Sequence, residues 1–353
     1  MYLRLRIRGH LPGNLALFGA IVLLAGCVSQ PAAVDYYVRT EYQISAQDAE
    51  PIRPTLDVIV LGGGHGYRSA SYGGSNLWGR VRSRMALRIA HNPRVDKEIR
   101  RLKPNPRYLE QLSKRAGPYL HLIMNEIERR GMPAELALLP EIESQYNPRA
   151  LSPKSAAGMW QFIPGTGRRY GLKQNGWYDG RNDIVASTHA ALDYLQWLHR
   201  EFRGDWALAL AGYNAGEGAV AAARRRNRSR GKGTDFWSLD LPSETEHYVP
   251  RLMAVAKLVQ KPQRYGMRPP HIPNGPQLEL VDMGRQMDLS RAAKLSGVRL
   301  ADLRRLNPGL KQGKTLPAGP HRLLVPIGSG RGLRAKSSKS QLRLPTIAQG
   351  GMS

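Results

Sequence analysis

A helical repeat of apolar residues runs through the middle of the chain, and convincing alternating strands are absent from residues 77–261. One face of a predicted helix carries four residues at i, i+3, i+4 and i+8: Tyr119, Leu122, Ile123 and Ile127. Similar patterns predict further helices over 134–144, 187–202, 206–223 and 242–259. A segment of this length can bury a full core without disulfides, so we expect a mainly α domain over 77–261.

A proline-rich segment separates this domain from a smaller module. Residues 262–276 contain five prolines, which is typical of a semi-rigid linker. Beyond it, 277–281 and 323–326 have strand character, and helical patterns lie near 292–295 and over 300–306. We therefore expect a small α+β module, strand–helix–helix–strand, over 277–327. Residues 328–353 hold five basic residues and no acid, and we expect a disordered basic tail there.

The N-terminus has the order of a secretory signal. Arg4, Arg6 and Arg8 precede a short apolar run over 15–24, which is followed by Leu24-Ala25-Gly26-Cys27. These last four residues resemble a bacterial lipobox, in which the cysteine is lipidated. The resemblance implies a lipoprotein signal peptide over 1–26 and a membrane anchor on Cys27. With Val28 following the cysteine, it implies the periplasmic face of the outer membrane. Residues 27–76, with Gly-rich runs, are predicted to be a flexible tether.

The charge balance indicates an anionic partner. Lys and Arg number 53 against 27 Asp and Glu, which gives a formal net charge of +26. Nucleic acid, anionic lipid and cell wall would all satisfy this charge, but an exported protein does not meet cellular nucleic acid. We therefore expect a cell-wall polymer as partner and no nucleic acid, and interpret the basic run 224–230 as a solvated loop or an anion-facing rim. The sequence carries no signal of an oligomeric state, and its single cysteine excludes a disulfide framework or a Cys-based zinc site.

The first candidate site segment is 141–148, where a carboxylate, Glu141 or Glu143, ends an apolar helix just before a proline-marked break. Apolar surroundings raise a carboxyl pKa, as a general acid at neutral pH requires. Glu141 and Glu143 lie two residues apart, roughly 200° around a helix, so they cannot both face one cleft. This excludes the two-carboxylate dyad of ordinary glycosidases. Taken alone, a Glu at a helix end is more often a solvated charge.

Three further segments supply polar and small residues. Residues 156–164 contain Gly158, Met159 and Gln161, and 212–216 contain Tyr213 and Asn214. In 242–249, Ser243 is predicted to be a helix N-cap, and only Tyr248 is a ligand candidate. Gln, Tyr and Asn side chains can hydrogen-bond sugar amides and hydroxyls, and glycine lets backbone approach a ligand. Taken alone, 156–164 is equally compatible with a tight turn between core helices. Taken alone, 212–216 is equally compatible with an Ala-rich helix that stops at a glycine.

In this order, the segments closely resemble the family 1 lytic transglycosylases, which share a goose-lysozyme-like fold. The matching motifs are Glu143-Ser144, Gly158-Met159-Trp160-Gln161 and Tyr213-Asn214-Ala215-Gly216. The run from Trp160 to Gly171 is similar to the membrane-bound D branch of the family. Gly212 stands where the family usually has Ala. The resemblance covers about 77–261.

The resemblance implies a single-acid mechanism on peptidoglycan glycan strands. Glu143 would protonate the glycosidic oxygen between MurNAc and GlcNAc and later accept the proton of the MurNAc C6 hydroxyl, giving a 1,6-anhydro sugar without consuming water. Ser144 would orient Glu143, and the substrate would be held by Ser144, Gly158, Met159, Gln161, Tyr213, Asn214 and Tyr248. No metal or organic cofactor is implied. Two alternatives stay open: a lysozyme-like muramidase that uses water through the same Glu143, and a non-catalytic cell-wall scaffold.

The 277–327 module resembles a LysM peptidoglycan-binding domain. The run from Val298 to Pro308 is similar to the second helix of that domain and the Asn that follows it. The usual Gly-Asp-Thr-Leu after the first strand is replaced here by Asp282-Met283-Gly284-Arg285. Two roles are therefore open for the module, glycan binding and a structural appendage.

Overall fold

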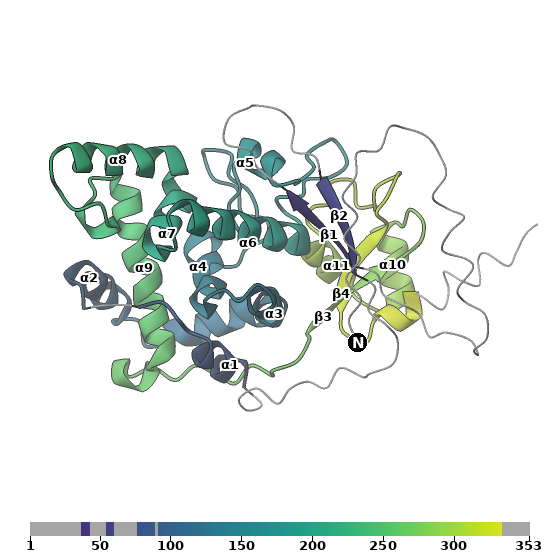
Figure 1. Cartoon of the computed structure of the whole chain (residues 1–353). Helices are drawn as coiled ribbons and strands as arrows, with labels where there is room; N and C mark the ends of the chain where they lie inside the picture. The colour runs from purple at the N-terminus through teal and green to yellow at the C-terminus, as the bar shows by residue number, and fades with distance from the viewer. Residues whose placement is uncertain (1–36, 43–53, 60–75, 89–90, 334–353) are drawn as a thin grey trace, which may run out of the picture. The chain divides into compact units, whose positions relative to one another are not determined.

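The computed structural model describes residues 37–42, 54–59, 76–88 and 91–333 (Figure 1). The chain divides into two units, 1–70 and 71–353. The predicted signal peptide, Cys27 and the part of the predicted tail from 334 lie outside the described residues. Within the described part of the chain, no helix has the length and apolar character needed to cross a membrane.

The first unit contains a pair of strands inside the predicted tether. β1 (Tyr37–Tyr42) pairs antiparallel with β2 (Pro54–Ile59), with Tyr37 opposite Ile59. Both segments are rich in β-branched and aromatic residues, which favour strands. Both strands lie inside the segment 27–76, for which the sequence predicts a flexible tether from its lack of periodicity and its glycine runs.

The predicted mainly α domain is confirmed. Its helices, with three 3₁₀ segments labelled η, are α1 (Leu77–Ser83), α2 (Pro93–Leu102), α3 (Tyr108–Arg129), η2 (Ala134–Leu138), α4 (Leu139–Ser144), α5 (Pro164–Arg169), α6 (Ile184–Glu201), α7 (Trp206–Ala215), α8 (Glu217–Ser229), η3 (Phe236–Ser238), α9 (Ser243–Gln260) and η4 (Pro262–Tyr265). The central element is α9, which contacts α2, α7, η2 and α4. Figure 1 shows α3, α4, α6, α7 and α9 grouped together, and this group carries the candidate site.

Three local predictions differ from the structure. Residues 134–144 form a 3₁₀ turn followed by a short α-helix with Pro140 in its first turn, rather than one helix. The helix predicted over 206–223 is divided at Gly216, whose φ of 85° ends α7 before α8 begins. Ser243 is not an N-cap, because Pro242 occupies that position and its carbonyl accepts the N–H groups of Thr245 and Glu246.

Two buried tryptophans anchor the core of this domain. Trp78 is fully buried and donates its indole N–H to the Ser113 hydroxyl over 2.9 Å. Trp160 is also fully buried and donates to the Thr188 hydroxyl on α6 over 3.0 Å. Trp160 belongs to the loop 155–162, which contains the candidate residues Gly158, Met159 and Gln161. The side chain that fills the core therefore also holds this loop against α6.

The predicted strand–helix–helix–strand module is confirmed. β3 (Leu278–Asp282) pairs antiparallel with β4 (Arg322–Pro326), and α10 (Leu289–Ser296) and α11 (Leu300–Leu306) lie between them in the chain. Its core is apolar and includes Val281, Leu289, Leu303, Leu323 and Val325.

The segments on both sides of this module make contacts that the sequence did not predict. Leu333 is fully buried in the module core and residues 330–333 are helical, so order extends past the predicted tail boundary at 328. The linker 262–276 is not a free spacer, because Met267 and Ile272 are buried in the core of the helical domain. The Ile272 carbonyl also accepts the Leu77 N–H over 2.8 Å.

A substitution at Gly158 should test the packing of the site loop. Gly158 has a φ of +83°, and a Cβ there would lie 1.8 Å from the backbone oxygen of Arg181. We expect Gly158→Ala to lower the free energy of unfolding by more than ~2 kcal/mol, measured by urea denaturation. The matched control is Gly165→Ala on α5, where a Cβ meets nothing within 4 Å. Equal stability of the two variants would contradict the assigned packing.

Candidate active site

The candidate acid Glu143 lies in the last turn of α4, where the backbone leaves the helix under strain. Gln145 and Tyr146 both have left-handed backbone angles, with φ of 54° and 57°. The strain is held by Tyr146, which is buried, donates its hydroxyl to the Ala137 carbonyl over 2.6 Å and donates its N–H to the Pro140 carbonyl over 2.9 Å. Backbone strain of this kind persists only where surrounding contacts maintain it, and it is common at functional sites.

Glu143 is a carboxyl group with a pKa near neutrality. The Tyr248 hydroxyl on α9 donates a hydrogen bond to its Oε1. Burial raises the pKa of Glu143 to about 7; the bond from Tyr248 opposes this shift, and the negative charge of Glu244 adds to it. A carboxyl group with this pKa can both give and accept a proton at neutral pH.

Two tyrosines beside Glu143 stay neutral. Burial, followed by the charge of Glu143, raises the pKa of both Tyr213 and Tyr248 well above the usual phenol value. The Tyr213 hydroxyl donates to the Trp160 carbonyl over 2.9 Å, and its ring contacts the rings of Phe162 and Tyr194. Both phenols therefore act as hydrogen-bond donors and carry no charge at neutral pH.

Glu141 has a different environment from Glu143, as their spacing predicts. Its Oε1 lies 2.5 Å from Nη2 of Arg115, and the carboxylate is buried. Burial raises the pKa of Glu141 while Arg115 and Tyr108 oppose the shift. Since Glu141 is committed to this ion pair, it does not form a catalytic pair with Glu143.

The loop 155–162 differs in detail from the sequence-based expectation. Ser144 does not bond Glu143; its hydroxyl donates to the Met159 carbonyl over 2.8 Å. The Met159 side chain is fully buried, so we assign it to packing rather than ligand contact. Gly158 is close to the Arg181 backbone rather than to an open face. Gln161, with a φ of 49°, donates its side-chain N–H to the Gly158 carbonyl over 2.8 Å and remains partly exposed.

Asn214 joins the end of α7 to the start of α9. Its side-chain oxygen accepts from the Thr245 hydroxyl over 2.7 Å, and its nitrogen lies 3.5 Å from Oε1 of Glu244. Because Glu244 also acts on Glu143, Asn214 belongs to the same group of residues as Glu143, Tyr213 and Tyr248. Asn214 and Gln161 are both partly exposed.

Two features of the site were not predicted from the sequence. Glu244 raises the pKa of Glu143, and the signal for it was its i, i+4 spacing to Tyr248 on one face of α9. The second is the pair Asp179 and Arg181, which holds the loop 155–162 and has no recognisable local pattern. Among the described residues, no group of three or more His, Cys, Asp or Glu is arranged to hold a metal ion.

Two family models match the chain. Residues 122–236 match the transglycosylase SLT domain, and residues 277–342 match the LysM-like domain of lytic transglycosylase MltD. The first match contains Glu143, Gln161 and Tyr213, so residues 122–236 form a domain of the transglycosylase SLT type. The second domain of the chain is a LysM-like domain of the MltD type.

Particular relatives agree with this assignment. The chain is 40% identical over 268 residues to membrane-bound lytic murein transglycosylase D of Escherichia coli (strain K12), which covers 76% of this chain and 59% of that protein. It is 47% identical over 120 residues to a putative tributyltin chloride resistance protein of Alteromonas sp. (strain M-1), covering 33% of this chain and 58% of that one. The chain thus spans a little under three fifths of each of these relatives.

Solved structures of lytic transglycosylases are more distant. The 70 kDa soluble lytic transglycosylase of Escherichia coli is 20% identical to this chain, with a TM-score of 0.30. The match covers 55% of this chain and 27% of that enzyme. The Pseudomonas aeruginosa Slt is 22% identical, with coverages of 54% and 31% and a TM-score of 0.34. These scores are too low to add to the family match.

The bond from Tyr248 should set the pKa of Glu143 measurably. It stabilises the charged carboxylate, so Tyr248→Phe should raise the pKa of Glu143 further above 7. The measurement is an NMR titration of the ¹³C-labelled Glu carboxyl groups. Tyr213→Phe is the matched control, because its hydroxyl bonds the Trp160 carbonyl instead. A lower pKa in Tyr248→Phe would contradict the assigned role of this bond.

Proposed function

We propose that the chain is a peptidoglycan lytic transglycosylase, which cleaves the β-1,4 bond between MurNAc and GlcNAc and leaves 1,6-anhydroMurNAc ends. The observation that carries the proposal is Glu143: one partly buried carboxyl group, with a pKa of about 7, held by a neutral Tyr248. Glu141 is paired with Arg115, so this neighbouring carboxylate is not available as a nucleophile beside Glu143. The SLT domain and the names of the murein transglycosylase relatives support the same reaction.

In the first step, protonated Glu143 gives its proton to the glycosidic oxygen. The bond between MurNAc C1 and this oxygen breaks, and the GlcNAc hydroxyl leaves. The acetamido oxygen of MurNAc assists by attacking C1. The raised pKa serves this step because a substantial fraction of Glu143 holds a proton at neutral pH.

In the second step, the C6 hydroxyl of MurNAc attacks C1 and displaces the acetamido oxygen. Deprotonated Glu143 accepts the hydroxyl proton and returns to its starting state, so the reaction consumes no water. Tyr248 supports this stage because its hydrogen bond stabilises the carboxylate form. One carboxyl group is therefore sufficient for both proton transfers.

The glycan would be held by the polar groups that remain accessible. Gln161 and Asn214 are partly exposed and present amide groups to sugar hydroxyls and acetamido groups. Tyr213 and Tyr248 use their hydroxyl protons within the protein, so each would accept rather than donate a hydrogen bond from the sugar.

Replacement of the acid tests the proposal directly. Glu143→Gln should reduce turnover of purified peptidoglycan by about 10³-fold, because glutamine can neither give nor accept the proton. Wild-type digestion in water labelled with ¹⁸O should yield anhydro ends without the label, read by mass spectrometry. The matched control is Glu246→Gln on α9, which should retain wild-type turnover.

The outcomes separate the candidate functions. Reducing ends that carry ¹⁸O would indicate a muramidase that uses water. Unchanged digestion by Glu143→Gln would show that another group is the acid. Absence of digestion by the wild-type protein, with retained binding to peptidoglycan, would indicate a cell-wall scaffold.

Glu143 should also make stability depend on pH. Its pKa rises from a usual 4.5 to about 7 on folding, so the folded state binds the proton more tightly than the unfolded state. Stability is then greatest below about pH 4.5 and falls as the pH rises through 7. Glu143→Gln removes this loss and should be about 1–3 kcal/mol more stable than wild type at pH 8, with little difference at pH 4, in chemical denaturation. The same difference at both pH values would contradict the raised pKa.

We also propose a membrane location, through lipid on Cys27, at the periplasmic face of the outer membrane. The support is the sequence Leu24-Ala25-Gly26-Cys27 and the membrane-bound relatives. Cys27→Ala should move the protein from the membrane pellet to the soluble periplasmic fraction, because acyl chains supply the membrane affinity. A variant that stays in the pellet at high salt would contradict lipid anchoring.

A further inference from the structure

The LysM-like module contacts one loop of the SLT domain through its backbone. The Asp179 N–H donates to the Gly309 carbonyl over 2.9 Å, and the Lys311 N–H donates to the Trp177 carbonyl over 2.9 Å. Side chains add to this pairing: Nζ of Lys311 donates to the Asn175 carbonyl over 3.0 Å, and Nε2 of Gln312 donates to the Gly176 carbonyl over 2.9 Å. The segment 309–312 thus holds the loop 175–179 over its whole length.

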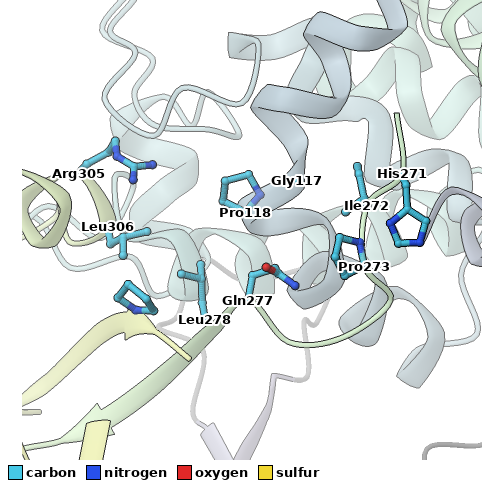
Figure 2. Close-up of a pocket in the computed structure, with 10 residues that line it drawn as sticks. Gly117, Pro118, His271, Ile272, Pro273, Gln277, Leu278, Arg305 and Leu306 are labelled. Atoms are coloured by element: carbon cyan, nitrogen blue, oxygen red, sulfur yellow. The ribbon is translucent and has the colours of Figure 1, made fainter. Parts of the chain in front are cut away.

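A second contact joins the module to the helical domain. The side chain of Arg149 donates to the Arg304 carbonyl over 2.7 Å, and Leu306 is buried in the core of the helical domain. Beside this contact lies a cavity of about 390 Å³, and Figure 2 shows Pro118 of α3 and Leu278 and Leu306 of the module among its lining residues. Direct bonds on one side and apolar burial on the other fix the module to the SLT domain.

Asp179 connects the contacted loop to Arg181. Its two carboxylate oxygens accept from Nε of Arg181 over 3.0 Å and from Nη2 over 2.7 Å. Nη1 of Arg181 then donates to the carbonyls of Ser155 and Phe162, over 2.7 Å and 3.3 Å. These two carbonyls lie at the two ends of the loop 155–162, so one buried guanidinium group holds both ends.

The loop 155–162 in turn positions the neighbours of Glu143. Its Met159 carbonyl accepts the hydroxyl of Ser144, the residue after Glu143, over 2.8 Å. Its Trp160 carbonyl accepts the Tyr213 hydroxyl over 2.9 Å. A displacement of this loop would therefore move the groups that surround the acid.

We propose that the LysM-like module acts as a brace for the active site: the segment 309–312 fixes Asp179 and Arg181, and these hold the loop 155–162 in place. Asp179 and Arg181 are positioning residues, since neither bonds Glu143. The catalytic consequence rests on the proposed function, whereas the mechanical contact does not.

Gly309 offers a selective test of the brace. A Cβ at this position would lie 3.0 Å from the Asp179 backbone oxygen and 3.0 Å from the Tyr178 ring, so Gly309→Val should push 309–312 away from the loop. We expect the amides of Ala157, Gly158 and Phe162 to exchange hydrogen about 10-fold faster in the full chain, by mass spectrometry. We also expect kcat on peptidoglycan to fall about 5-fold with KM nearly unchanged. Gly275→Val is the matched control, because a Cβ there meets nothing within 4 Å.

A double-mutant cycle separates bracing from general damage. Asp179→Asn should give the same faster exchange, and adding Gly309→Val to it should have little further effect, because both act through Arg181. If Gly309→Val does not fold, Lys311→Ala combined with Gln312→Ala replaces it, since both side chains are exposed. Unchanged exchange in 155–162, or fully multiplicative effects on kcat, would overturn the proposal. If wild type has no turnover, the proposed function fails, and the exchange data still decide whether the brace exists.

Discussion

The hydrogen bond between the buried Tyr248 and the partly buried Glu143 is the interaction on which the site depends. A carboxyl group removed from water keeps its proton more readily, and a donor aimed at it restores part of the stability of the charged form. The balance places the pKa of Glu143 near 7, the range in which one group can act both as acid and as base. This pKa depends on α9, which brings Tyr248 to the end of α4. The contacts of α9 with α2, α7 and η2 hold it there.

The strained backbone around Glu143 is maintained by the helical core. Gln145, Tyr146 and Gln161 all have left-handed backbone angles, which carry a conformational cost outside glycine. Buried hydrogen bonds of Tyr146 and Trp160 offset this cost by tying both strained segments to the packed helices. The site is therefore pre-organised by residues that do not touch its acid, which is the usual arrangement where charge develops during a reaction.

The LysM-like module has a different relation to the SLT domain from the one its linker suggests. Proline-rich linkers usually separate domains, but here Met267 and Ile272 are buried against the helical domain and 309–312 bonds one of its loops. The module departs from the usual LysM motif at Asp282-Met283-Gly284-Arg285. This departure agrees with a module that contacts the SLT domain of its own chain. Of the two roles left open by the sequence, the structural one has direct contacts in its favour.

Helical periodicity and the separation of Glu141 from Glu143 were determined by the sequence, because each depends on spacing within one element. The order of the three motifs was also determined by the sequence, because it is read directly along the chain. The spacing of Glu141 and Glu143 alone was enough to place them in different environments. Only the tertiary structure decided which side chain bonds Glu143, since Tyr248 lies 105 residues away and nothing local connects the two. The same holds for the bond of Ser144 to Met159, the burial of Met159 and the path from Gly309 through Asp179 to the site loop. These features depend on how separate elements pack against one another. The local sequence pattern of one element does not indicate which distant residues it will contact.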